Sequence, residues 1–160
     1  MTAAAQSEIV VGLNRSPSGR AAWDWASAYS RSHGDRLRAV HVYEHPSSLD
    51  RARNELQAMF AESGPEPDWQ LDFLDGHVGE VLLEQSRHAR MLVIGTREHV
   101  GVNRVLHGSV SHFCLNNAHC PVVAVPPGHL PAEETLRGPM HTCGPATLRS
   151  RRSSLDETNP

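Results

Sequence analysis

Five short apolar segments alternate with four amphipathic segments along residues 8–126, and this alternation restricts the fold more than any other feature. The clearest apolar segment, Met91-Leu92-Val93-Ile94, is apolar at every position. A strand of this kind is typical of a parallel sheet that is covered by helices on both faces. The segment order therefore predicts an α/β fold, namely a doubly wound sheet of five parallel strands in an open, Rossmann-like sandwich.

Local signals set the expected bounds of these elements. In the first helix, apolar residues recur at helical spacing on a face that includes Trp25, which predicts Trp25 in the core and Trp23 at the surface or in an interface. A Ser47-x-x-Asp50 capping sequence is expected to open the second helix. The predicted strands are residues 8–13, 37–43, 69–74, 91–94 and 121–125, and the predicted helices begin near residues 18, 47, 78 and 109.

The chain divides into a folded domain and two flanking segments. Residues 1–7 are expected to be a flexible N-terminus and residues 8–126 the domain. Residues 127–160 carry 5 Pro and 3 Gly without apolar periodicity, which predicts a disordered tail. The N-terminus lacks a basic signal-peptide region, and no apolar run approaches the roughly 20 residues of a membrane span. We therefore expect a cytoplasmic protein that does not bind membranes.

Composition excludes several kinds of chemistry. All 15 basic residues are Arg, so a phosphate-binding P-loop lysine, a Schiff-base lysine and a kinase lysine are all absent. The net charge of −3 and the lack of a basic stripe argue against nucleic-acid binding. The three cysteines and the histidines lack the short spacings of zinc sites, so no metal site is predicted. No nucleophile and base can be paired, which predicts that the protein has no catalytic residues and is not an enzyme.

Two predicted strands end in loops rich in small residues, Asn14–Ser18 and residues 95–108. Doubly wound sheets bind ligands at the carboxyl ends of their strands. Gly95 lets the backbone approach a ligand, and Gly108 permits an unusual turn before the next helix. Ser109 and Ser111 open that helix, whose free N–H groups and dipole favour an anion. The sequence therefore predicts a site for an anionic ligand at this edge of the sheet.

Seven short motifs recur in a fixed order: Ile9-Val10-Val11-Gly12 with Ser16-Pro17, Trp25-Ala26, Ala39-Val40-His41-Val42, Gly76 before Val81-Leu82-Leu83, Leu92-Val93-Ile94-Gly95-Thr96-Arg97, Leu106-His107-Gly108-Ser109-Val110-Ser111, and Cys120-Pro121-Val122-Val123-Ala124-Val125. With these motifs at this spacing, the chain resembles a universal stress protein domain over residues 8–126. Nucleotide-binding members of that family carry the pattern G-x2-G-x9-G-S/T. Here the pattern begins at Gly95 and ends at Gly108-Ser109, with Glu98 in the place of its second glycine.

The resemblance implies an ATP site, with Mg²⁺ as a candidate partner of the nucleotide. Asn14 stands where the family usually has Asp, near the ribose, and Val42 offers its backbone to the adenine. The residues expected to bind the nucleotide are Asn14, Val42, Gly95, Arg97, Gly108, Ser109, Val110 and Ser111. The resemblance also implies a homodimer in which the last strand, Pro121 to Val125, pairs with its copy in a second subunit.

Two functions are compatible with the sequence, and they differ in whether a phosphate can bind beside Glu98. A carboxylate about 4 Å from a phosphate charge costs about 1 kcal/mol in water and about 4 kcal/mol at an effective dielectric near 20. The first function is a non-catalytic, ATP-binding stress protein in which Arg97 and Arg104 offset that cost, or in which Glu98 turns outward or holds a divalent cation. The alternative is a dimeric scaffold of the same family that has lost nucleotide binding and acts through unknown protein partners.

Overall fold

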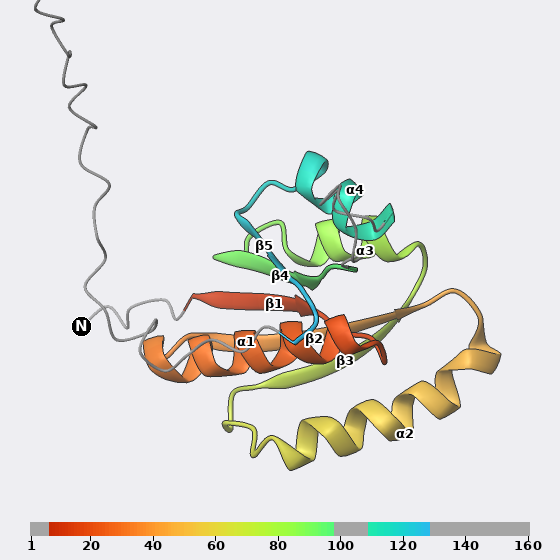
Figure 1. Ribbon diagram of the computed structural model, residues 1–160, viewed down its shortest axis with the longest axis horizontal. Coiled ribbons are helices and arrows are strands. Elements are labelled where there is room, and N and C mark those ends of the chain that lie inside the picture. Colours follow the sequence, from red (N-terminus) through yellow and green to blue (C-terminus); the bar gives the residue numbers. More distant parts are fainter. Residues whose placement is uncertain (1–6, 98–108, 129–160) are drawn as a thin grey trace, which may run out of the picture.

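Strands and helices alternate strictly along residues 7–97 and 109–128, which are the residues that the computed structural model describes (Figure 1). This order confirms the predicted fold class. The predicted N-terminal segment and tail lie outside the described residues except at Ser7 and at residues 127–128. The strands are β1 (Glu8–Gly12), β2 (Arg36–Tyr43), β3 (Gln70–Asp75), β4 (Met91–Gly95) and β5 (Val122–Val125). The helices are α1 (Pro17–His33), α2 (Pro46–Glu62), α3 (Val78–Gln85) and α4 (Ser109–Asn117).

The five strands form one parallel sheet in the order β3-β2-β1-β4-β5. From β1 the chain continues to β2 on one side, and from β4 it continues to β5 on the other. The direction of winding therefore reverses between β1 and β4. Gly12 lies opposite Ile94, so the two strands end almost level. Their carboxyl ends form the switch point at which sheets of this type bind ligands.

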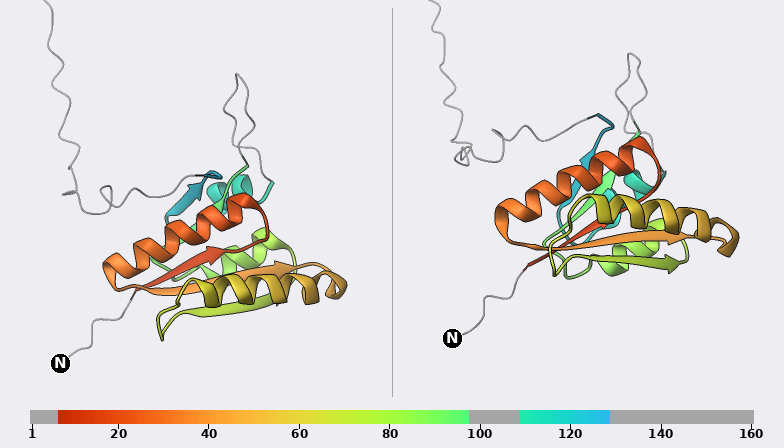
Figure 2. Two further views of the ribbon diagram at one scale, coloured as in Figure 1. Left: turned by 60° about the horizontal axis from the view of Figure 1, so that its bottom comes forward. Right: turned by 90° about the horizontal axis from the view of Figure 1, so that it is seen from below.

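Two helices cover each face of the sheet, as Figures 1 and 2 show. Helices α1 and α2 pack on one face and enclose the larger core cluster, which includes Ile9, Val11 and Val93. Helices α3 and α4 pack on the other face over Val10, Leu92 and neighbouring residues. Because β1 and β4 are buried on both faces, their continuous apolar sequence follows from their central position. No helix of the described segments has the length and apolar character needed to cross a bilayer.

The ends of α1 match the sequence signals, whereas the start of α2 does not. Helix α1 ends at Gly34, which adopts φ 68°, a left-handed conformation that glycine tolerates best. Helix α2 begins at Pro46, with His45 as an N-cap that makes no side-chain capping bond. The Ser47-x-x-Asp50 prediction is therefore wrong. Proline starts the helix one residue early because its φ suits the first helical position, and this leaves Ser47 inside the helix.

The prediction that Trp23 lies at the surface or in an interface is wrong, whereas Trp25 does pack against the core, although it is only partly buried. Trp23 is only 1% exposed and lies with its ring centroid 5.4 Å from that of Phe60 and 5.7 Å from that of Trp69. Trp25 is half-buried and stacks on Tyr29. The buried stripe of α1 consists mainly of small residues, which let the helix approach the sheet closely. Trp23 then falls on the flank that faces α2, a neighbour that helical periodicity does not identify.

Candidate functional site

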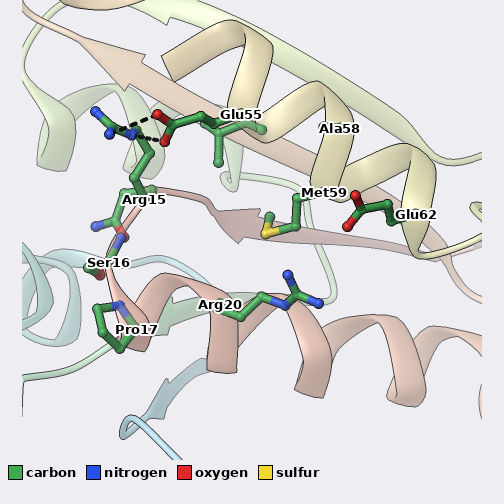
Figure 3. A pocket seen from close by; sticks show the side chains of 10 residues that line it. Arg15, Ser16, Pro17, Arg20, Glu55, Ala58, Met59 and Glu62 are labelled. Atoms are coloured by element: carbon green, nitrogen blue, oxygen red, sulfur yellow. Dashed lines mark hydrogen bonds and ion pairs between the residues drawn. The ribbon is translucent and has the colours of Figure 1, made fainter. Parts of the chain in front are cut away.

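A pocket of about 510 Å³ opens between the first turn of α1 and the second half of α2 (Figure 3). We call it the α1–α2 pocket. Its charged residues come from the loop after β1 and from both helices, and an apolar wall is formed by Leu56, Ala58 and Met59. The full lining is Asn14, Arg15, Ser16, Pro17, Arg20, Glu55, Leu56, Ala58, Met59 and Glu62.

An ion pair joins the loop after β1 to α2 at the rim of this pocket. The guanidinium of Arg15 donates two hydrogen bonds to the Glu55 carboxylate, from Nε to Oε2 and from Nη2 to Oε1, the latter at 3.0 Å. Arg51, one turn earlier on α2, donates from Nε to Oε1 at 3.2 Å. The hydrogen bond from Arg15 holds the pKa of the Glu55 carboxyl below its usual range, and the hydrogen bond from Arg51 contributes less to the same effect. The sequence shows the Arg51–Glu55 spacing, but nothing in it relates Arg15 to Glu55.

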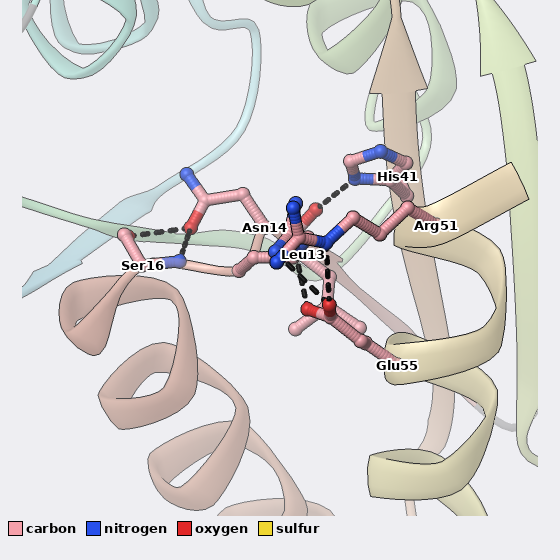
Figure 4. Close-up of polar contacts among 7 residues, drawn as sticks. Leu13, Asn14, Ser16, His41, Arg51 and Glu55 are labelled. Carbon is pink, nitrogen blue, oxygen red and sulfur yellow. Dashed lines mark hydrogen bonds and ion pairs between the residues drawn. The ribbon is translucent and has the colours of Figure 1, made fainter. Parts of the chain in front are cut away.

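The side chain of Asn14 organises the same loop (Figure 4). Its Oδ1 accepts from the backbone N–H of Ser16 at 3.0 Å and from the Ser16 hydroxyl at 2.6 Å. Since only the carbonyl end of an amide accepts hydrogen bonds, these contacts also orient the side chain. The Nδ2 group donates to none of the described residues and points away from Ser16. The Asn14 carbonyl is thus used by the loop, and its Nδ2 group has no partner among the described residues.

Gly95 at the end of β4 packs against the start of α1. A Cβ built on Gly95 would lie 2.5 Å from the carbonyl carbon of Ser18 and 2.9 Å from the backbone nitrogen of Gly19. The absence of a side chain is therefore required by contact within the protein, besides any role toward a ligand. Thr96 follows as a buried residue whose N–H donates to Val125, and Arg97 is exposed at the end of the described segment.

A second pocket, of about 260 Å³, lies between the first turns of α3 and α4. We call it the α3–α4 pocket. Two predicted site residues, Ser109 and Val110, line it, and Ser111 is buried behind them at 3% exposure. Val42 is also buried, two residues before Glu44, which belongs to the lining. The full lining is Glu44, His77, Val78, Gly79, Glu80, Ser109, Val110 and Phe113.

The predicted site residues therefore divide between the two faces of the sheet near the carboxyl ends of its strands. Asn14 lines the α1–α2 pocket, while Ser109 and Val110 line the α3–α4 pocket. Val42, Gly95, Arg97 and Ser111 line neither of these two pockets. Gly108 and Glu98 lie outside the described residues. Sequence reasoning did not identify Arg15, Glu55, Glu44, His77 or Glu80, because each becomes a neighbour of the site only through the fold.

A histidine of β2 and two cysteines are further reactive side chains among the described residues. His41 donates from Nδ1 to the carbonyl of Leu13 at 2.8 Å and meets the edge of Phe73. Cys114 and Cys120 are free thiols, and burial raises the pKa of Cys114 to about 11. Within residues 7–97 and 109–128, no three His, Cys, Asp or Glu side chains are grouped so that they could hold a metal ion.

Comparison with known proteins relates this arrangement to one family. A family model described as "Universal stress protein family" matches residues 48–126. A universal stress protein of Mycobacterium tuberculosis H37Rv is 31% identical over 131 residues, which cover 73% of this chain and 47% of that protein. The chain thus spans about half the length of that curated relative.

Solved structures show the same fold at lower identity. A universal stress protein in complex with cAMP has a TM-score of 0.59 and 24% identity, and the match covers 78% of this chain and 99% of that one. The protein from Archaeoglobus fulgidus in complex with dAMP has a TM-score of 0.56 and 18% identity, covering 74% and 97%. The strand order, the family model and the curated relative agree, and the chain belongs to the universal stress protein family.

Proposed function

We propose that this chain is a non-catalytic universal stress protein that binds an adenine nucleotide at the carboxyl ends of β1 and β4. The observation that carries the proposal is the switch point between these strands, which brings the Asn14 loop and the start of α4 to the same edge of the sheet. Nucleotide complexes of two universal stress proteins of the same fold, with cAMP and with dAMP, support it.

The described residues offer a nucleotide three kinds of contact. The Nδ2 group of Asn14 is a donor for a ribose oxygen, and the backbone beside Val42 lies at the end of β2, where an adenine edge would meet it. The first turn of α4, with Ser109 and Val110, offers N–H groups and a positive dipole to a phosphate. Gly95, Arg97, Gly108 and Ser111 complete the proposed set by the family motif. ATP with Mg²⁺ is the first ligand to test, and a bound Mg²⁺ would neutralise phosphate charge.

The proposal includes no catalytic step. Hydrolysis would need a general base beside the ligand, and the best-placed candidate of β2, His41, already donates to Leu13. Binding alone is then the activity, and the bound nucleotide would act by stabilising the domain.

Thermal unfolding of the full chain with ATP, AMP and cyclic AMP, each with and without Mg²⁺, tests the proposal. A ligand present at a hundredfold excess over its dissociation constant adds about 2.7 kcal/mol to the free energy of unfolding. For a domain of this size we expect a rise of several degrees in the melting temperature. If no adenine nucleotide shifts the transition, the alternative function of a dimeric scaffold without a nucleotide replaces this one.

A further inference from the structure

The α3–α4 pocket carries a charge pattern that restricts which nucleotide the proposed site can hold. We infer that the site favours adenine nucleotides with a single phosphate over triphosphates, and that Glu44 and Glu80 set this preference. The inference rests on the proposed function and specifies its ligand class.

The two carboxylates lie beside the residues expected to meet the phosphates. Glu44 directly follows β2, and Glu80 stands in the first turn of α3. Both are exposed and line the α3–α4 pocket together with Ser109 and Val110 at the start of α4. The tertiary structure thus places two negative side chains at the helix terminus that the sequence motif assigns to phosphate.

Little positive charge faces these carboxylates. Among the described residues that line the pocket, none is Arg, and His77 is the one basic group, with its Nδ1 3.9 Å from the Glu44 carboxylate. The chain contains no Lys that could reach in from elsewhere. Arg15 is already paired with Glu55 at the other pocket, and Arg97 of the proposed site does not line this one. The carboxylates are therefore not neutralised by the described side chains of this pocket.

The helix termini offset only about half of the charge of the two carboxylates. Each helix N-terminus acts as roughly half a positive charge, so α3 and α4 together supply about one. The two glutamates contribute two negative charges, which exceeds that sum. One phosphate can still bind by accepting hydrogen bonds from the N–H groups of a helix terminus. Each further phosphate lies farther from those groups, adds negative charge and is repelled by the two carboxylates. A volume of about 260 Å³ also lies below the roughly 300–1,000 Å³ usual for ligand pockets.

The size of the effect follows from Coulomb's law. Two unit charges about 8 Å apart in water change an equilibrium constant about twofold. Two carboxylates acting on the two extra phosphates of ATP form four such pairs, which gives a discrimination of the order of tenfold at low salt. Screening shortens the range of the repulsion to about 8 Å at physiological ionic strength, so the discrimination should fall as salt is added.

The test is isothermal titration of the full chain with AMP, ADP and ATP without divalent cations, at low and at physiological salt. We expect affinity to fall from AMP to ATP, and the difference to shrink with salt. The double substitution Glu44→Gln with Glu80→Gln should raise the affinity for ATP about tenfold relative to AMP. The control is Glu66→Gln, which removes one negative charge ahead of β3, a strand length from the pocket, and should leave the ratio unchanged.

The outcomes separate this inference from the proposed function. If none of the three nucleotides binds to either protein, the proposed function fails and the inference fails with it. If nucleotides bind but ATP binds as tightly as AMP, or the double variant leaves their ratio unchanged, the inference alone is overturned. A change in the ratio in the same direction for the Glu66→Gln control would also overturn it, because the effect would then come from net charge.

Discussion

At the scale of single residues, Asn14 divides its two polar ends between the fold and a ligand. Its carbonyl holds the backbone and hydroxyl of Ser16, whose own hydroxyl accepts from the N–H of Gly19 and so caps α1. The amide nitrogen is left as a donor. An aspartate at this position would keep one oxygen on Ser16 and present a second acceptor instead of a donor.

We therefore predict that Asn14→Asp tightens AMP binding by about 1 kcal/mol, because ribose hydroxyls would donate to a charged acceptor. The carboxylate also lies near the N-terminus of α1, where a negative charge adds about 0.3–1 kcal/mol to stability. Asn14→Ala should instead lower the free energy of unfolding by about 1 kcal/mol. Calorimetric titration and chemical denaturation measure the two effects. An aspartate variant that binds AMP no more tightly than wild type would contradict this prediction.

Glu98 carries a prediction that rests on the sequence motif alone, since this residue lies outside the described segments. Glu98→Gly removes a negative charge from the phosphate-binding motif, so ATP should bind more tightly by about 1 to 3 kcal/mol, with a smaller gain at high salt. AMP should gain less because it carries fewer phosphates. If Glu98 instead ligates Mg²⁺, the substitution would weaken Mg-ATP while helping metal-free ATP, and titrations with and without Mg²⁺ separate the two cases.

Cys114 makes stability depend on pH in the alkaline range. Burial, with the neighbouring Cys120 as a lesser cause, raises the pKa of this thiol from 9.0 to about 11. The unfolded chain then loses the proton first, so this contribution is complete below about pH 9 and is lost as pH rises toward 11. We expect about 2 kcal/mol of destabilisation across that interval, measured by denaturant melts. Cys114→Ala should abolish most of this dependence of stability on pH. The effect can be seen because the chain contains no Lys that would titrate in the same pH range.

At the scale of elements, the end of β4 lies in close contact with the start of α1 beside the switch point. Gly95 meets backbone atoms of α1, whereas Gly12 at the end of β1 meets the side chain of Leu82. Both glycines lie at strand ends, and sequence alone does not distinguish them. The difference between a backbone neighbour and a side-chain neighbour decides how a methyl group is accommodated.

Gly95→Ala is expected to destabilise the protein by about 3 kcal/mol, because neither α1 nor β4 can yield without losing packing. Gly12→Ala is the matched control. Its Cβ would lie 2.9 Å from a terminal carbon of Leu82, a side chain that can rotate, and the cost should be about 1 kcal/mol. Chemical denaturation of both variants measures the difference. Equal costs would show that the approach of α1 to β4 is not what requires a glycine.

At the scale of the whole molecule, β5 is an edge of the sheet, as its position in the strand order shows. The carbonyls of Pro121 and Val125 accept from β4, so by the alternation of a strand the polar groups of Val122 and Ala124 face outward. Leu115, on the adjacent helix α4, is 40% exposed. An apolar edge strand that is left uncovered invites pairing with another chain.

We propose that this edge pairs with its copy in a homodimer. Light scattering should give twice the chain mass of 17.6 kDa at micromolar concentration. Ala124→Pro removes an outward N–H while leaving the bonds to β4, and we expect it to yield a monomer whose circular dichroism matches that of wild type. A wild-type mass of one chain would refute the dimer.

The order of elements was predictable from sequence, because each depends on signals within a few residues of itself. The apolar run of β4, the glycine that ends α1 and the small-residue loop after β1 are all local. Their arrangement as a parallel sheet follows from packing rules that apply to any chain with this pattern. The start of α2 was misplaced by one residue because two local signals, a proline and a serine, compete there.

The sequence by itself determined the fold class, the edge of the sheet where a ligand is expected and the motif residues from Gly95 to Ser111. Only the tertiary structure decided which residues surround that edge. Trp23 is buried because α2 lies over it, and Arg15 pairs with Glu55, which is 40 residues away. Glu44, which follows β2, and Glu80 of α3 line one pocket with the start of α4. Periodicity reports which face of an element is apolar, but contacts between elements depend on strand order and helix placement, and these follow from the packing of the whole chain.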